Sequence, residues 1–268
     1  MTSEHGRSPA GFAATYTRQA ATYDRSRSAG IETLEPLLAA LAHAPGRHVL
    51  DIGGGTGNYA VALKDAGYDV LVLDMSQDML TVAASKGLRV RRADATALPE
   101  PDSSADAVTM IAMLHQIPDW RAALCEARRV LRPGGLLCLL LYTSEHMTAH
   151  YFLDYFPSSR SWATTDMRPI AEYVNELPGA TPHPIQIRGT DDLTMQVMRR
   201  HPSLALDPEL TGQTSFFTRL QSENPQELAT GLVRLAEDIN FGRLPDSHDR
   251  DLVDGDAYLV VWQKPEHV

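Results

Sequence analysis

The sequence predicts an α/β protein in which helices flank a doubly wound, mostly parallel sheet. An apolar run at 48–52 breaks into a glycine cluster and then into an amphipathic segment at 59–64. Strand, glycine turn and helix form the entry unit of such a sheet, whose ligands bind beyond the carboxyl ends of the strands. Further β-rich runs alternate with helical patterns along the next part of the chain, at 69–74, 89–92, 105–112 and 136–141, and a later run at 184–189 is expected to form the sixth strand. This alternation is typical of a parallel α/β sheet.

The glycine cluster allows two interpretations that depend on its spacing. It comprises Gly53, Gly54, Gly55 and Gly57, with Asp51 two residues before the first. A dinucleotide site prefers G-x-G-x-x-G, with the pyrophosphate on the helix N-terminus. Asn58 stands where that pattern requires its third glycine. The acidic Asp51 would repel a pyrophosphate and suits a cationic ligand, so the cluster favours a different nucleotide-like cofactor.

Composition limits the classes of function. The formal charge of −10 disfavours a nucleic-acid partner, because binding to phosphates relies on lysine and arginine. The cysteines, Cys125 and Cys138, form neither a disulfide framework nor a zinc signature, which indicates a reducing compartment. The N-terminus lacks the layout of a signal peptide, and the apolar run at 136–141 is too short to span a membrane. We therefore expect a soluble cytoplasmic protein that acts without a membrane.

Two acidic residues follow predicted strands at positions where ligands bind. Asp74 ends the run at 69–74, about 20 residues past the glycines, where a carboxylate meets ribose hydroxyls. The alternative is an acid at the N-terminus of the helix predicted from Met75 onward. Asp94 begins the loop D-A-T-A-L-P after the third strand. Asp94 either contacts a ligand at this strand end or is an ordinary turn residue.

Taken together, these motifs resemble the class I S-adenosylmethionine-dependent methyltransferases, and in particular the small-molecule enzymes of ubiquinone and menaquinone biosynthesis. The residues that carry the resemblance are the acid-led glycine loop at 51–57, the D-A loop at 94–95, the L-H segment at 114–115 and the turn Leu131-Arg-Pro-Gly-Gly135. The resemblance covers about residues 12–142, with a weaker match at the last strand. It implies a seven-stranded, Rossmann-like methyltransferase fold and S-adenosyl-L-methionine as cofactor.

The resemblance also implies which residues contact the cofactor. The N-terminal segment around Tyr23 and Arg27 would fold over it, although an ordinary amphipathic helix is equally compatible with this stretch. The expected cofactor-binding residues are Tyr23, Arg27, Asp51, Gly53, Gly54, Gly55, Gly57, Asp74, Met75, Asp94, Ala95, Ala112 and Met113.

Three residues are candidates for a catalytic proton acceptor: His115, Tyr142 and His146. Imidazole titrates near neutrality, which suits a general base, but a structural histidine beside the cofactor is the alternative for His115. His146 and His150 would share one face of a helix, yet no third metal ligand is evident, so we predict no metal site. The aromatic residues between 142 and 162 either line an acceptor pocket or form core.

These observations predict an N-terminal helical cover at 1–45, a methyltransferase core at 46–189, a helical insertion at 190–254 and a final strand of the core at 255–268. The expected function is methyl transfer from S-adenosyl-L-methionine to a small apolar or aromatic molecule, for example in secondary metabolism, by a monomer or homodimer. One alternative is a nicotinamide-dependent oxidoreductase. Another is a protein that keeps the pocket without methylating.

Overall fold

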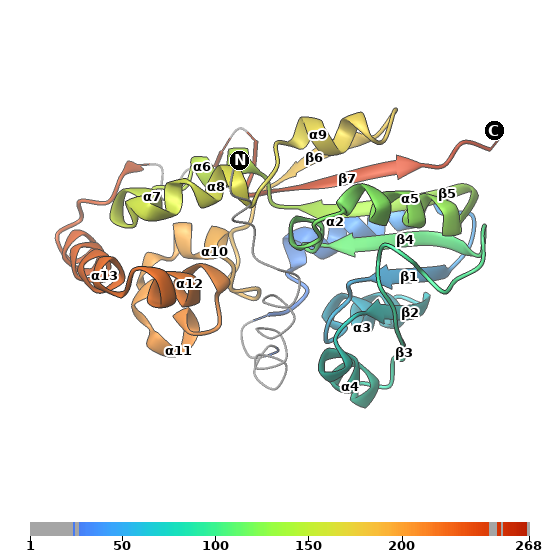
Figure 1. Ribbon diagram of the computed structural model, residues 1–268, viewed down its shortest axis with the longest axis horizontal. Helices are drawn as coiled ribbons and strands as arrows, with labels where there is room; N and C mark the ends of the chain where they lie inside the picture. The colour runs from blue at the N-terminus through green and yellow to red at the C-terminus, as the bar shows by residue number, and fades with distance from the viewer. Residues whose placement is uncertain (1–23, 25–26, 247–250, 253, 267–268) are drawn as a thin grey trace, which may run out of the picture.

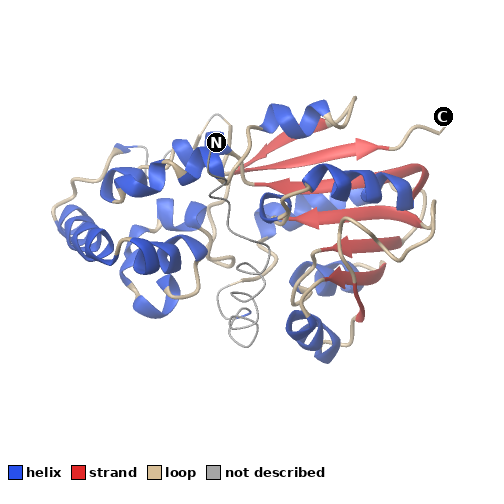
Figure 2. Ribbon diagram, viewed as in Figure 1, coloured by secondary structure: helices blue, strands red, loops and turns tan. Residues whose placement is uncertain are grey.

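The computed structural model describes residue 24 and residues 27–246, 251–252 and 254–266. These residues form a seven-stranded sheet in the order β3-β2-β1-β4-β5-β7-β6. Helices cover both faces of the sheet, and a separate group of helices lies beyond one end of its strands (Figure 1; Figure 2). The prediction of a doubly wound, mostly parallel sheet of seven strands is confirmed.

The strands are β1 (His48–Ile52), β2 (Asp69–Asp74), β3 (Arg89–Arg92), β4 (Ala105–Ile111), β5 (Leu131–Leu141), β6 (Thr181–Ile185) and β7 (Ala257–Gln263). The first five strands run parallel to one another, whereas β7 is antiparallel to both β5 and β6. Parallel strands that are covered on both faces read as continuous apolar runs. This explains why the central strands were recognisable in the sequence.

Successive residues of a strand point to opposite faces, so each face has its own core. On β1, Val49 packs into one core and Leu50 into the other. The first face is covered by α2 (Ile31–Leu41), α3 (Asn58–Asp65) and α4 (Gln77–Ser85). The second is covered by α5 (Trp120–Val130) and α9 (Ile170–Asn175), which bring Trp120 and Tyr173 into edge contact at 4.9 Å between ring centroids.

The edge strand β6 lies earlier in the chain than the sequence suggested. The apolar alternation favoured a strand at 184–189, but the structure has it at Thr181–Ile185. Pro182 and Pro184 fall inside it, which is tolerated because an edge strand has one side without a sheet partner. The final strand β7 is found where it was predicted.

The remaining helices form a unit with a third hydrophobic core. Its elements are α6 (Ser144–Thr148), α7 (Phe152–Tyr155), η3 (Pro157–Arg160), α8 (Trp162–Thr165), α10 (Met195–Arg200), η4 (Pro202–Leu206), α11 (Pro208–Thr211), α12 (Ser215–Glu223) and α13 (Pro225–Asn240). Phe152, Phe156, Phe216 and Phe217 pack edge to face inside it. Figure 1 shows this helical unit beyond the carboxyl end of β4. The aromatic residues at 151–162 therefore belong to this third hydrophobic core. The division of the chain into a cover, a core, an insertion and a final strand remains a prediction.

A buried ion pair ties the helical unit to the sheet. Arg199 of α10 donates from Nη2 to Oδ1 of Asp256 at 2.6 Å, and both side chains are at most 1% exposed. The second carboxylate oxygen accepts from the Ile187 amide at 2.9 Å. Since a buried charge that loses its partner is costly, this pair fixes the unit against the start of β7.

Across the described residues, no helix combines the length and apolar character needed to cross a membrane.

Candidate functional site

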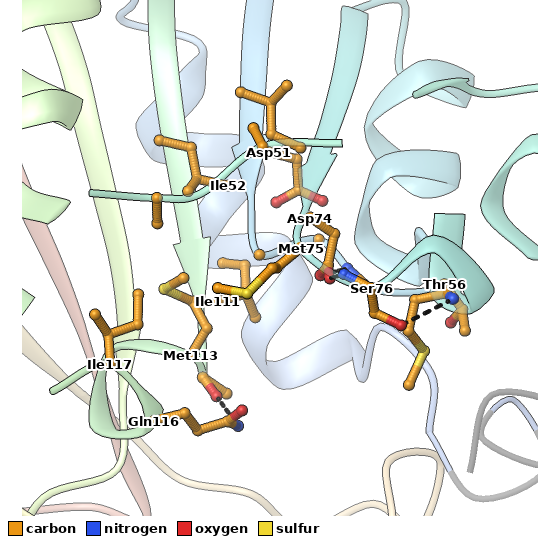
Figure 3. A pocket seen from close by; sticks show the side chains of 18 of the residues that line it. Asp51, Ile52, Thr56, Asp74, Met75, Ser76, Ile111, Met113, Gln116 and Ile117 are labelled. Carbon is orange, nitrogen blue, oxygen red and sulfur yellow. Dashed lines mark hydrogen bonds between the residues drawn. The ribbon is translucent and has the colours of Figure 1, made fainter. Parts of the chain in front are cut away.

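A cavity of about 690 Å³ opens at the carboxyl ends of the parallel strands. The lining residues come from the glycine loop, from the ends of β2 and β4, from the loop after β3 and from Tyr142, which follows β5. Figure 3 shows the side chains of Asp51, Asp74, Met75 and Met113 gathered there from three strand ends. This edge is where open α/β sheets bind ligands, and the volume suits a small molecule.

The glycine loop requires its glycines for two reasons. Gly53, Gly55 and Gly57 have φ of +68°, +56° and +79°, a region that favours glycine. At Gly54, an added Cβ would lie 2.4 Å from Oδ2 of Asp51. A Cβ on Gly55 would meet nothing within 4 Å, and Gly55 lines the cavity. The backbone at Gly55 is therefore open to direct approach by a ligand.

Asp74 holds the loop in place while lining the cavity. Its Oδ2 accepts from the Gly55 amide at 2.9 Å, and its Oδ1 accepts from the Ser76 amide at 2.8 Å. Burial raises the pKa of Asp74, and these amide hydrogen bonds oppose that change. A carboxylate oxygen has more than one acceptor position, so Asp74 can bind hydroxyl groups in addition to these amides.

Asp51 lies beneath the loop and is 1% exposed. Its Oδ1 accepts a hydrogen bond of 2.7 Å from Thr109 Oγ1 on β4. Burial raises its pKa from 3.8 to about 7; the Thr109 bond lowers it, and the nearby charge of Asp74 raises it further. Asp51 therefore titrates near neutrality and becomes more acidic when a cation enters the cavity.

The loop after β3 lies at the other side of the cavity. Asp94 Oδ1 accepts from both the amide and the hydroxyl of Thr96, at 2.9 and 2.8 Å. Asp94 thus has the turn role that was its alternative. Both hydrogen bonds of the turn end on Oδ1, so they do not use Oδ2. Ala95 also lines the cavity, and the Met75 side chain is 52% exposed at its wall. This side of the cavity therefore has one acidic side chain, Asp94, and two apolar ones, Ala95 and Met75.

Ala112 and Met113 line the cavity directly after β4. Ala112 has φ of +50°, which is unusual for a residue with a Cβ and occurs mainly where function constrains the backbone. Its amide bonds to the Leu140 carbonyl at 2.9 Å, which holds this conformation. Met113 packs against Gly53, where an added Cβ would lie 2.6 Å from the methionine methyl group.

The end of the N-terminal segment is attached to the glycine loop. Thr56 Oγ1 donates to Asp24 at 2.6 Å, and Asn58 Nδ2 donates to the Arg27 carbonyl at 2.7 Å. Lys86, near the end of α4, contacts Asp24 at 2.7 Å. Arg27, which is expected to contact the cofactor, lines the cavity, while Tyr23 lies outside the described residues. Thr56 and Asn58 were not predicted to have these roles.

Of the three proton-acceptor candidates, only Tyr142 lines the cavity. Burial raises its pKa well above 10, so Tyr142 stays a neutral phenol. His115 is half-buried behind the lining, next to Gln116, and burial lowers its pKa to about 4. A histidine with that pKa is neutral near pH 7 and is a weak base.

His146 is 3% exposed, and its ring has structural partners on both nitrogens. Nδ1 bonds to the Thr143 amide at 3.1 Å, and Nε2 bonds to the Asp254 carbonyl at 2.9 Å. His150 lies beyond the end of α6 and bonds to the Met195 carbonyl at 2.7 Å. The two histidines therefore do not share one helix face, as the sequence had suggested. Within the described part of the chain, no three His, Cys, Asp or Glu side chains gather as metal ligands do.

One further cavity residue had no signal in the sequence. Asp192 precedes α10, lines the cavity and forms an ion pair with Arg27 at 3.5 Å. It belongs to the polar stretch expected as an insertion, where one acidic residue looks like any other. Only the fold brings it to the Tyr142 side of the cavity.

Comparisons with known proteins agree with this architecture. Residues 50–139 match the model of a methyltransferase domain family. Demethylmenaquinone methyltransferase from Thermus thermophilus is 44% identical over 109 residues, which are 38% of this chain and 49% of that protein. The enzyme of the same name from Clavibacter sepedonicus is 32% identical over 154 residues, covering 54% of this chain and 63% of that protein. The chain spans about half the length of the curated relatives it matches.

A solved structure extends the agreement in fold beyond the matched segment. A putative methyltransferase from an antibiotic biosynthesis pathway of Anabaena variabilis superposes with a TM-score of 0.76 at 24% identity, covering 88% of this chain and 98% of that one. Residues 50–139 are thus a class I S-adenosylmethionine-dependent methyltransferase domain, with distant homology to the demethylmenaquinone methyltransferases.

Proposed function

We propose that this chain transfers the methyl group of S-adenosyl-L-methionine to a small apolar or aromatic molecule. The observation that carries the proposal is Asp74, which faces the cavity while its two oxygens accept from Gly55 and Ser76. This arrangement puts a fixed carboxylate beside an open glycine backbone, where a ribose with two hydroxyls would fit.

The other cofactor contacts follow from the positions of the lining residues. Asp94 and Ala95 would meet the adenine, and the exposed Met75 side chain would cover an apolar ring face. Asp51, Gly53 and Met113 also line the cavity. An ionised Asp51 would attract the sulfonium and ammonium charges of the cofactor, which supports a cationic ligand over a pyrophosphate.

The chemistry requires the acceptor to lie in line with the methyl group and the sulfur. Positioning of this kind supplies much of the rate in a displacement reaction. The cavity walls that remain, from Ile111, Ile117, Leu140 and Tyr142, are mostly apolar. An apolar or aromatic acceptor fits them, as do the quinone-type substrates that the names of the relatives indicate for those proteins. A monomer or homodimer in the cytoplasm remains our prediction.

A transfer assay tests the function. The purified chain is incubated with S-adenosyl-L-methionine labelled at its methyl group and with phenolic, amine and naphthoquinol acceptors. We expect label in an acceptor and an equal amount of S-adenosylhomocysteine. Binding of the cofactor without transfer to any acceptor would indicate the non-methylating alternative. Binding of a nicotinamide dinucleotide in its place would refute the proposal.

A further inference from the structure

The Tyr142 side of the cavity contains a carboxylate for which the cofactor contacts proposed above have no use. Asp192 reaches this wall from the segment before α10 and lies near enough to Tyr142 for its charge to act on the phenol. The lining carboxylates Asp51, Asp74, Asp78 and Asp94 lie on or after β1, β2 and β3. Asp119 is occupied as the N-cap of α5, accepting from the Ala122 amide at 3.1 Å. Asp192 is thus the lining carboxylate that lies beside Tyr142 and pairs with Arg27.

Its surroundings suit a proton acceptor. Arg27 and Tyr142 are the charged and titratable groups that face it: Arg27 Nη1 lies 3.5 Å from Oδ1, and the charge of Asp192 raises the pKa of Tyr142. The Ser28 amide also bonds to this carboxylate, but Oδ1 of Asp192 is buried and has no hydrogen-bond partner among the described residues. Oδ1 is therefore the acceptor position that is left for another donor. Burial raises the pKa of Asp192 and the Arg27 guanidinium lowers it. A carboxyl group with a raised pKa is a better base than an exposed one.

We infer that Asp192 takes the proton of the methyl acceptor, and that the acceptor therefore carries a hydroxyl or amine at the atom that is methylated. This rests on the proposed function. The acceptor heteroatom attacks the methyl carbon and forms the new bond while the carbon–sulfur bond breaks. The electron pair of that bond stays on sulfur and gives neutral S-adenosylhomocysteine. The proton of the heteroatom moves to Oδ1 of Asp192, and water later removes it.

Tyr142 has a different part in this arrangement. Because its pKa is raised well above 10, it remains protonated and can donate a hydrogen bond to the acceptor but cannot remove a proton. Tyr142 is therefore a positioning residue, and Tyr142→Phe should raise the acceptor KM more than it lowers kcat. Asp192→Asn keeps the shape of the side chain and removes the base, so its main effect should be on kcat.

The test compares the wild type with Asp192→Asn and with the control Asp191→Asn, which changes the exposed neighbouring side chain. Calorimetric titration with S-adenosylhomocysteine comes first, and the three proteins should bind within about twofold of one another. Single-turnover transfer from labelled S-adenosyl-L-methionine is then measured with 4-nitrocatechol as the hydroxyl probe, tryptamine as the amine probe and 1,4-naphthohydroquinone as a probe that also offers a ring carbon.

We expect transfer to oxygen or nitrogen in the wild type, a loss of about 100-fold or more in Asp192→Asn, and loss of the acidic limb of the pH–rate profile in that variant. Equal rates in the two variants would overturn the role of Asp192. Transfer to ring carbon alone, or to none of the probes, would overturn the acceptor class. Absence of cofactor binding in the wild type would instead refute the proposed function itself.

Discussion

The substitution Asp51→Asn should raise the free energy of unfolding of the cofactor-free protein at neutral pH. It should also lower the affinity of the protein for a cationic ligand. Asp51 is 1% exposed, and burial raises its pKa from 3.8 to about 7. Between these values the unfolded chain has lost the proton and the folded chain has kept it. The contribution of Asp51 to stability is therefore complete below about pH 4 and falls as the pH rises toward 7.

The magnitude follows from the two pKa values. The interval from 3.8 to about 7 corresponds to at most about 4 kcal/mol, at about 1.4 kcal/mol per pH unit. Asparagine removes this cost because it carries no charge. Its carbonyl oxygen can still accept the hydrogen bond from Thr109 Oγ1, which Asp51 accepts at 2.7 Å. The variant should thus gain up to that amount relative to the wild type at about pH 8, and little at about pH 4.

Urea unfolding of both proteins between about pH 4 and pH 8 measures this difference, with Asp65→Asn on the exposed end of α3 as control. Groups distant from Asp51, including the buried histidines, titrate in both proteins and cancel when the free energies of unfolding are subtracted. Asp74, whose charge acts on Asp51, does not cancel, and the change in its titration is part of the measured difference. A difference between wild type and Asp51→Asn that stays constant across this range would show that Asp51 is ionised in the folded state at all these pH values, and would refute the reasoning.

Two further outcomes are expected. Gly55→Val should weaken S-adenosylhomocysteine binding by at least about 100-fold, because its side chain would enter the ligand space, whereas Gly179→Val should bind normally. Gly179 has φ of +85° and open space around it, so the two variants share the backbone strain, and equal binding by both would show that the glycines serve only the turn. Arg199→Met should lower the free energy of unfolding by about 3 kcal/mol, because the buried Asp256 then keeps only the Ile187 amide and the more distant Arg200 guanidinium at 3.6 Å. Arg89→Met removes an exposed pair with Asp69 and should cost less than about 1 kcal/mol in the same chemical denaturation; similar losses in both would contradict the role of the buried pair.

The sheet could be predicted because its signals are local in the chain. The buried strands read as apolar runs, and Pro133 and Gly134 mark the start of the long β5, where Gly134 has φ of +77°. The edge strand β6 could not be placed from its pattern, because Pro182 and Pro184 are compatible with a strand only at an edge. Whether a strand is at the edge depends on the whole topology.

The residues of the site also fall into two groups: those that local spacing predicts and those that only the fold brings to the cavity. Asp51, Asp74 and the glycines lie within one strand–turn–helix unit and its neighbour, so spacing was enough to bring them together. His146 had the residue type of a base, but its position is set by contacts with Thr143 and the distant Asp254. Asp192 reaches the cavity only because the helical unit docks beyond the strand ends, which no local pattern expresses.

The most direct test of the account is a calorimetric titration of S-adenosylhomocysteine into the wild type, Asp74→Ala and Asp69→Ala. Asp69 lies at the exposed opposite end of β2 and is the matched control. We predict binding of one molecule per chain, weakened by about 1–3 kcal/mol in Asp74→Ala, or roughly 5- to 150-fold, and unchanged in Asp69→Ala. Equal affinity in wild type and Asp74→Ala, with the fold of the variant intact by circular dichroism, would remove Asp74 from the site and contradict the central claim.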